Sequence, residues 1–260
     1  MNVHLALTKS HWAISNDGCS IEHIIKKRQD KQQLYHNVID KYRTEWKNGR
    51  NDWYKACYER YYSDNNFDSC PTLQFLVESK TPLVIGHGGT SVLETSLTLH
   101  RIYGVPYLPA TSLKGLAAHY AHNILGETHS ALRREGEDYK VLFGTQQSAG
   151  FIQFHDALVT PDTAQEALKL DVFTPHHQDY NGIVIAEVQF NKTYPAPRDD
   201  DSPVPIPFLT ANGQFQIALA CEGETELANE WLSLAKDILS KALANEGIGA
   251  KTNVGYGRMV

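Results

Sequence analysis

Residues 247–258 combine glycines with positive charge, a composition that suits contact with phosphate groups. Glycine has no side chain to keep another backbone at a distance, and lysine and arginine supply the charge that attracts a sugar-phosphate backbone. The candidate contacts in this segment are Gly249, Lys251, Thr252, Gly255, Gly257 and Arg258. A turn followed by an edge strand would have the same composition, so the residues alone leave both interpretations open.

The tripeptide Ala250-Lys251-Thr252 is similar to the end of a phosphate-binding P-loop, but the full pattern is missing. A P-loop needs a glycine directly before the lysine and another glycine five positions earlier. Ala250 and Asn245 occupy those two positions here. A P-loop also opens a helix, whereas this segment follows one, so we do not expect a nucleotidase.

A second candidate lies around Pro109, where the chain is predicted to enter a helix near Ser112. Thr111 and Ser112 have the hydroxyl groups typical of helix caps, and Lys114 would lie in the first turn. A cation there opposes the helix dipole, which favours anions at this end. A bound phosphate would relieve the conflict, because helix N-terminal amides and a lysine together form an anion site. An exposed lysine at small cost is the alternative.

The third candidate is the Gly-His-Gly-Gly sequence of residues 86–89, which places His87 in a tight turn. An imidazole can act as a general base or a metal ligand, although a loop histidine usually does neither. The other histidine pairs are His119 with His122 and His176 with His177. None has a cysteine or an acidic residue at metal-ligand spacing, so we expect no metal and no other cofactor.

Hydrophobic periodicity predicts the elements that position these candidates. Strands are expected at residues 72–86, 93–99, 105–109, 150–159 and 213–222, followed by a final strand, and helices at 112–125 and 225–247. Thr225 is the expected N-cap of the last helix and Gly247 its C-cap. The order of elements predicts an α+β fold of the ferredoxin-like, split βαβ type, with insertions.

The composition is that of a globular chain of 260 residues with a net charge of −6, enough for one large or two small domains. Such a charge argues against a polybasic nucleic-acid binder taken as a whole. The four cysteines, at positions 19, 57, 70 and 221, form no C-x-x-C pair and suit a reducing compartment. No apolar run approaches the length of a membrane span or a signal peptide, so we expect a cytoplasmic protein.

The net charge is a sum over unlike regions. Residues 26–50 contain eight cations and three anions, and residues 156–201 contain nine acids and three bases. Residues 160–210 are also rich in proline, which predicts a long loop or extended arm. The N-terminal aromatic residues are Trp46, Trp53, Tyr54, Tyr58, Tyr61 and Tyr62. They suit either base stacking beside a phosphate-facing basic patch or packing of an amphipathic helix.

Taken in order, these segments resemble a known family. The sequence GHGGTSVLETSLTLH is followed by YGVPYLPATSLKG, LFG, FHDA, PVPIPF and GIGAKTNVGYGR. This order is similar to the RAMP superfamily of CRISPR-associated proteins, and within it to the sixth subunit of the type III-B Cmr effector complex. The similarity runs from about residue 72 to the end. It implies a RAMP domain at 72–260 with an insertion at about 160–210. Residues 1–71 match no motif of the family, and their composition and periodicity predict a helical, locally basic segment. The family usually has Gly-Ser where this chain has Ala110-Thr111, so the turn there is expected to differ.

The resemblance implies an RRM-like core that binds guide RNA inside an antiviral ribonucleoprotein that targets foreign RNA. The expected partners are guide RNA, target RNA, the repeated backbone RAMP subunit and another RAMP subunit near the 3′ end of the guide. Cleavage would belong to the backbone subunit, so this chain is expected to be no enzyme. The implied RNA contacts are the C-terminal candidates above together with Gly86, His87, Gly88, Gly89, Thr111, Ser112, Lys114 and Gly115.

Asp156 also matches a family position, and we interpret it as structural. The alternative function is an endoribonuclease. Such an enzyme would use His87 or His119 as a general acid or base, or Asp156 with a metal ion.

Overall fold

The computed structural model describes residues 3, 7, 28–63, 70–89, 93, 95–174, 196–203, 205–222 and 225–260. The longer helices are α3 (Arg28–Glu45), α4 (Asn51–Tyr62), α5 (Ala110–Asn123), α6 (Glu137–Phe143) and α9 (Thr225–Asn245). The strands are β1 (Thr72–Glu78), β2 (Tyr107–Leu108), β3 (Ile152–Phe154), β4 (Ala157–Val159), β5 (Leu168–Phe173), β6 (Ile206–Ala211) and β7 (Gln214–Cys221). Short helical pieces are η2 (Trp46–Arg50), η4 (Leu125–Glu127), η5 (Ser130–Leu132), α7 (Pro161–Ala164) and η7 (Thr252–Val254).

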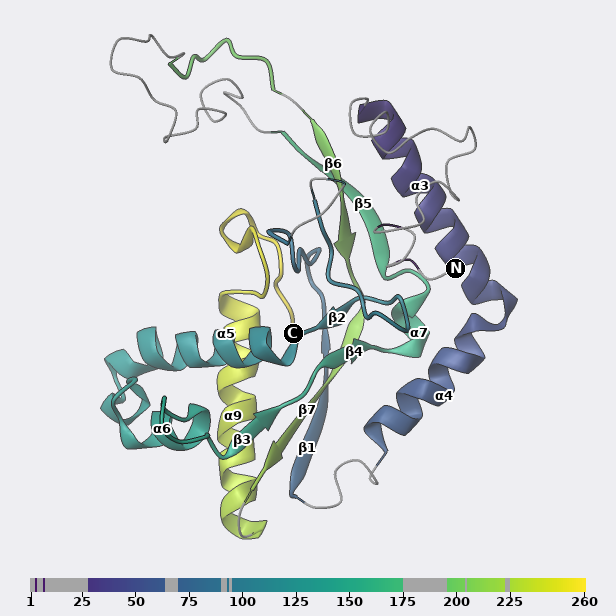
Figure 1. Cartoon of the computed structure of the whole chain (residues 1–260). Helices are drawn as coiled ribbons and strands as arrows, with labels where there is room; N and C mark the ends of the chain where they lie inside the picture. Colours follow the sequence, from purple (N-terminus) through teal and green to yellow (C-terminus); the bar gives the residue numbers. More distant parts are fainter. Residues whose placement is uncertain are drawn as a thin grey trace.

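The described chain forms a mixed α+β fold built on an antiparallel sheet in the order β1-β7-β4-β2, with β3 also paired to β7 (Figure 1). The central strand β7 buries Phe215, Ile217 and Leu219 on one face as the sequence predicts, but Ala218 and Ala220 are buried on the other face too, so the strand is not half-exposed along its length. Phe75 of β1 lies opposite Ile217, so the two strands contribute to the same apolar layer.

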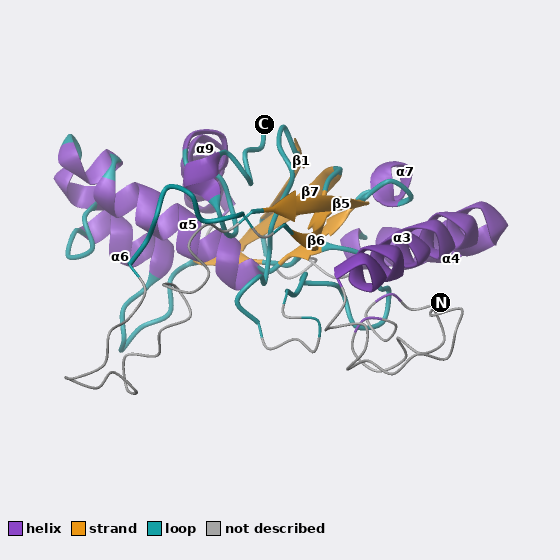
Figure 2. Ribbon diagram, turned by 90° about the horizontal axis from the view of Figure 1, so that it is seen from above, coloured by secondary structure: helices purple, strands orange, loops and turns teal. Residues whose placement is uncertain are grey.

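Helices cover both faces of this sheet, α5 and α9 on one side and α4 on the other (Figure 2). The long helix α9 buries Leu232, Leu239 and Leu243 against the core. It ends where the sequence predicts, because Gly247 has φ +78° and its amide donates a hydrogen bond of 3.1 Å to the Ala242 carbonyl. This left-handed glycine after the last turn confirms the predicted C-cap.

The aromatic residues of α4 pack against the sheet. Tyr54 is fully buried and its hydroxyl donates to the Val159 carbonyl at 2.7 Å. The Tyr62 hydroxyl donates to the Gln216 carbonyl at 2.6 Å and accepts from the Leu158 amide at 2.8 Å. For these tyrosines the packing interpretation holds, because their rings are buried and their hydroxyls are bonded to strand backbone.

Two arginines of the basic N-terminal segment make contacts within the fold, whereas Lys47 is exposed and forms no ion pair among the described residues. Arg43 pairs with Glu166 at 2.6 Å, and Arg50 pairs with Glu45 at 3.0 Å and donates to the Tyr103 carbonyl. These contacts attach α3 and α4 to the rest of the fold. Lys26 and Lys27, which contribute to the predicted basic patch, lie outside the described residues.

Several predicted strands differ from the structure. The strand predicted at 72–86 ends at Glu78, and beyond it Leu83 and Val84 form isolated bridges. The strand at 150–159 is interrupted at His155 and Asp156, which separate β3 from β4. In the described part of residues 93–99, pairing is limited to an isolated bridge between Leu99 and Pro106. The expected final strand is a single bridge between Met259 and Ser79. In the last two cases too few residues lie beside a partner strand to form a ladder, whereas β3 and β4 each pair with β7.

The predicted loop at 160–210 is in part regular structure. It begins with α7 and β5 and ends with β6, and β5 and β6 pair along Leu168–Phe173 and Ile206–Ala211 as a second, two-stranded sheet packed near α3. The acidic and proline-rich composition concealed the short apolar alternation of these two strands. Residues 175–195, with His176 and His177, lie outside the described residues.

In the described part of the chain, no helix is both long enough and apolar enough to cross a lipid bilayer.

Candidate nucleic-acid interface

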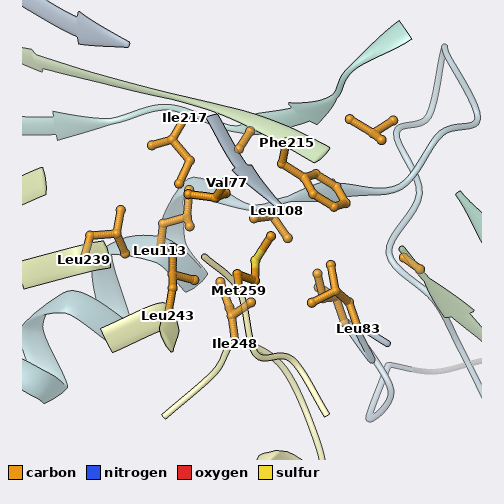
Figure 3. Packing of buried hydrophobic residues seen from close by; sticks show 14 of the residues in the cluster. Val77, Leu83, Leu108, Leu113, Phe215, Ile217, Leu239, Leu243, Ile248 and Met259 are labelled. Atoms are coloured by element: carbon orange, nitrogen blue, oxygen red, sulfur yellow. The ribbon is translucent and has the colours of Figure 1, made fainter. Parts of the chain in front are cut away.

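The three predicted segments emerge from one hydrophobic core. Leu83 precedes the 86–89 turn, Leu113 lies in the first turns of α5, and Ile248 and Met259 flank the C-terminal loop; all are buried. Figure 3 shows these side chains converging with Leu108 and Leu243. The three segments therefore border one hydrophobic core, although this core also extends through most of the described fold.

Backbone contacts pair the 86–89 turn with the C-terminal loop. Val84 and Gly249 form a parallel bridge, and the Ala250 amide donates to the Val84 carbonyl at 2.7 Å. Gly249 has φ +97°, and a β-carbon there would lie 2.5 Å from the Val84 carbonyl oxygen. A glycine is required at this position because the protein's own backbone passes against it.

The remaining glycines divide into two groups. A β-carbon at Gly257 would lie 2.1 Å from the Ile248 carbonyl oxygen, and one at Gly86 would collide with Thr98. Gly88 and Gly255, in contrast, have open space around them and are exposed. The prediction that another backbone approaches these glycines is thus met by the chain itself at Gly249 and Gly257, and the space is open at Gly88 and Gly255.

Lys251 has an unusual backbone conformation. Its φ of 62° and ψ of 27° make it the one non-glycine residue with positive φ among the described residues. A left-handed conformation costs a residue with a β-carbon roughly 1–2 kcal/mol. The Lys251 carbonyl accepts from the Val254 amide at 3.0 Å and the Tyr256 amide at 3.3 Å, which closes the loop. Strain of this kind often occurs at functional sites, which makes the residue worth testing.

The ammonium group of Lys251 lies 4.3 Å from the centroid of the Phe173 ring. A cation over an aromatic face is worth about 0.5–1 kcal/mol at an exposed site. Phe173 packs edge-on against His87 and Phe208, with ring centroids 5.8 and 5.4 Å away. Phe173 and Phe208 are not among the predicted site residues. The apolar alternation of β6 could have indicated Phe208, whereas Phe173 lies on the face of β5 that carries Lys169 and Asp171.

The His87 ring packs against both Phe173 and Phe208, and its centroid lies 5.8 Å from the centroid of the Phe208 ring as well. Desolvation lowers the pKa of His87, and the nearby positive charge of Lys251 lowers it further. Its Nδ1 is buried without a hydrogen-bond partner in the described part of the chain. The imidazole is therefore neutral near pH 7 and contributes ring packing to the loop pair.

The start of α5 differs from the prediction. The helix begins at Ala110, with Pro109 as its N-cap residue, so Thr111, Ser112 and Lys114 are its second, third and fifth residues. The Ala110 amide donates to Asp156 Oδ1 at 2.7 Å. A carboxylate thus already occupies the helix N-terminus, where it favours the dipole. This contact also agrees with a structural role for Asp156, and Ala110 needs no positive φ.

The polar residues of this helix start are less clearly placed toward the loops. Lys114 is half-buried and Gly115 is exposed, with open space around it. Thr252 lies in η7, directly after Lys251. Arg258 has its amide bonded to Thr81 Oγ1 at 3.0 Å, and its Nη1 is buried without a hydrogen-bond partner among the described residues. The structure thus unites the 86–89 turn with residues 249–251, and joins α5 to them through the shared core.

The electrostatics of this end differ from those of the basic N-terminal helices. Within the described ranges, Lys114, Lys251 and Arg258 form no ion pair, whereas Arg43 and Arg50 do. Cations without a carboxylate partner remain available to an anionic ligand.

The remaining candidates for catalysis have other partners. His119 lies 3.7 Å from the Glu246 carboxylate, and His122 Nδ1 accepts from the Arg134 amide at 3.2 Å. No group of three or more His, Cys, Asp or Glu side chains that could bind a metal occurs among the residues that the structure describes.

The sequence model of the RAMP superfamily matches residues 76–260, which is most of the chain and includes all three segments. The chain therefore belongs to the RAMP superfamily. It is similar to the CRISPR system Cmr subunit Cmr6 of Pyrococcus furiosus, with 29% identity over 78% of this chain and 72% of that protein.

Two further comparisons agree with this assignment. The CRISPR system CMR subunit Cmr6 of Saccharolobus solfataricus is 27% identical over 44% of this chain and 38% of its own length. A chain in the cryo-EM structure of the Type III-B Cmr-beta bound to cognate target RNA matches with a TM-score of 0.57. That match covers 96% of this chain and 78% of the other at 19% identity, and it shows a common fold.

Proposed function

We propose that this protein is a non-catalytic, guide-RNA-binding subunit of a type III-B CRISPR effector that targets foreign RNA. Its family, its similarity to Cmr6 proteins and its fold match to a chain of a target-bound Cmr-beta complex support this function. Its partners would be guide RNA, target RNA, the repeated backbone RAMP subunit and another RAMP subunit at the 3′ end of the guide. The setting would be the cytoplasm.

The observation that supports this proposal is the pairing of the 86–89 turn with the C-terminal loop. Together they contain Lys251, in a strained backbone conformation, and two glycines with open space around them. Gly88 and Gly255 leave space for a backbone, and Lys251 has no carboxylate partner in the described ranges. Phosphate and sugar contacts of this kind are independent of sequence. That is what a guide-bearing complex requires, since base pairing reads the target.

The order of elements supports an RRM-like core for this domain. A strand, a helix, an antiparallel strand pair and a second helix follow one another as β1, α5, β3 with β4, β7 and α9. The bridge at Met259 would stand for a reduced final strand beside β1. We also propose that residues 1–71 form a helical addition to a RAMP domain at 72–260 with an insertion at about 160–210.

In an RRM, bases stack on the open face of the sheet. The corresponding face here is covered by α4, whose Tyr54 and Tyr62 bond to its strands. RNA would therefore bind at the loop end of the core and not on the sheet face.

A ribonuclease has less support. The Asp156 carboxylate accepts a hydrogen bond from the Ala110 amide. The backbone carbonyl of Asp156 accepts one from the Tyr61 hydroxyl at 3.2 Å, so this residue has a structural role in the fold. Purified protein should leave labelled guide and target RNA intact with or without EDTA. Specific cleavage that is lost in His87→Ala or Asp156→Ala would overturn the proposal.

The direct test is co-purification of a guide-containing complex from cells that express the chain with its partner subunits. Lys114→Ala and Lys251→Ala should each weaken guide retention for every spacer. Each should also make the fall of log affinity with log salt concentration less steep, reducing the magnitude of the slope by about one per lost phosphate contact. Lys241→Ala, an exposed position on α9, is the matched control. Unchanged slopes in both variants would remove these lysines from the RNA path.

A further inference from the structure

The tip of the C-terminal loop is attached to β5 by two side-chain contacts. The Tyr256 hydroxyl donates to Asp171 Oδ2 at 2.8 Å, and the Lys251 ammonium lies over the Phe173 ring at 4.3 Å. Asp171 and Phe173 are two residues apart on one strand, so their side chains share a face. This face of β5 therefore contacts the C-terminal loop at two points, Lys251 and Tyr256.

These two contacts involve residues of the loop that lie beyond its backbone-bonded base. The base is fixed by hydrogen bonds from Ile248 to Gly257 at 2.9 Å and from Gly257 to Pro82 at 2.9 Å. Beyond the base, the tip residues Asn253 and Val254 are exposed. Backbone hydrogen bonds from Val254 and Tyr256 to the Lys251 carbonyl close the turn, and the side-chain contacts to β5 attach its two sides to the second sheet.

The contact between Tyr256 and Asp171 persists over the physiological pH range. Burial, the hydrogen bond to Asp171 and the negative charge of that carboxylate raise the pKa of Tyr256 to about 12, so its hydroxyl stays a donor. The Phe173 ring is itself fixed by Phe208, which is buried at the base of the second sheet. The ring beneath Lys251 therefore packs on a buried aromatic neighbour.

We infer that Asp171 and Phe173 are positioning residues, which hold Lys251 in the orientation that contacts the RNA backbone. This inference rests on the proposed function, since it concerns how that function's lysine is placed. It also connects the RNA-binding loop to β5 and β6, the strands that border residues 174–205. Any partner that shifts this two-stranded sheet would shift Lys251 with it.

The first experiment measures the position of Lys251 without RNA. Lysines of the full chain are labelled by reductive ¹³C-methylation, which keeps their charge, and the Lys251 signal is assigned with Lys251→Arg. The signal should be displaced upfield by the Phe173 ring, should return to the ordinary lysine position in Phe173→Leu, and should stay displaced in Phe173→Tyr. Val172→Ala, on the opposite face of β5, is the matched control. An undisplaced wild-type signal would overturn the inference.

The second experiment measures the salt dependence of guide binding in the assembled complex. Phe173→Leu should lower the slope by about one, as Lys251→Ala does, and the double variant should lower it no further. Asp171→Asn and Tyr256→Phe should act in the same direction, and Phe173→Tyr should restore the slope. A normal slope in Phe173→Leu, with a reduced one in Lys251→Ala, would overturn the positioning role alone. A normal slope in Lys251→Ala, with the displaced signal intact, would instead overturn RNA contact by this lysine.

Discussion

The α4–sheet interface and the paired glycine loops use similar residue types for opposite purposes. Around α4, aromatic rings and cations are turned inward, where Tyr54 and Tyr62 bond to strand carbonyls and Arg50 bonds to Glu45. In the loops, Lys251 is held on the surface by an aromatic ring and a strained backbone. The first region bonds these tyrosine hydroxyls and arginines within the fold, and the second leaves charge for a ligand.

This contrast shows that basic and aromatic composition alone does not identify a nucleic-acid interface. What distinguishes Arg43 and Arg50 from Lys251 and Arg258 is that the first two have carboxylate partners among the described residues. An internal partner makes a cation part of the packing, whereas a cation without one retains its capacity to neutralise phosphate. The comparison can be tested by variants that affect stability in one region and RNA binding in the other.

The largest effect is expected at Tyr54. Tyr54→Ala should lower the free energy of unfolding by about 3–5 kcal/mol, because it removes a fully buried ring and leaves a cavity. Urea denaturation checks the loss, and the salt slope of guide binding should be unchanged in the folded variant. Tyr54→Phe, which removes only the bond to Val159, should cost about 1–2 kcal/mol. A changed slope would show that α4 contacts RNA after all.

The next effect separates the two groups of glycines. Gly257→Ala should cost about 2–4 kcal/mol, because it adds a collision with the Ile248 carbonyl to the strain of φ +80°. Gly255→Ala has a similar φ of +97° but open space, so about 1–2 kcal/mol is expected. Urea unfolding of both variants measures the difference. Equal losses would mean that backbone strain, and not the close approach of the two chain segments, decides these positions.

A smaller effect concerns the strain at Lys251 itself. Lys251→Gly should be more stable than Lys251→Ala by about 1 kcal/mol, because glycine adopts the left-handed conformation without penalty. Both variants should lose the same salt slope in guide binding, since both lack the charge. The pair therefore separates stability from function at one residue. Equal stability of the two variants would show that the left-handed backbone is unstrained.

The smallest effect is a pH dependence. Burial lowers the pKa of His87 in the loops and of His100 and His155 near α4 and the sheet, with partial opposition from Asp156 for the latter two. Because the unfolded chain binds these protons more readily, stability is fully present above the model-peptide pKa near 6.5 and falls as the pH drops below it. Urea midpoints at pH 7.5 and 5.5 measure this loss.

His87→Gln and His155→Gln should each reduce the difference between the two midpoints. His129→Gln, at an exposed position, is the control and should leave the difference unchanged. If only His155→Gln reduced the difference between the two midpoints, burial of His87 would have no consequence for stability.

Several elements could be predicted because their signal is local. Strand β7 follows its apolar alternation, and α9 ends at Gly247 because a left-handed glycine stops a helix. The three candidate segments were recognised by composition and motif, and the structure brings the 86–89 turn and residues 249–251 together. The beginning of α5 was placed two residues late, because its cap comes from Asp156, 46 positions along the chain. The strands β5 and β6 were missed inside an acidic, proline-rich stretch.

The sequence by itself determined the family, the α+β class and the residue types available for binding phosphate. Periodicity and motif order are properties of the chain read in one dimension, so they survive without coordinates. Only the tertiary structure decided which glycines face the protein's own backbone, which tyrosines lie against the sheet and which lysine has a ring beneath it. Each of these depends on a partner far away in sequence, as Gly249 depends on Val84 and Lys251 on Phe173. Long-range packing fixes such pairs, and no local pattern encodes them.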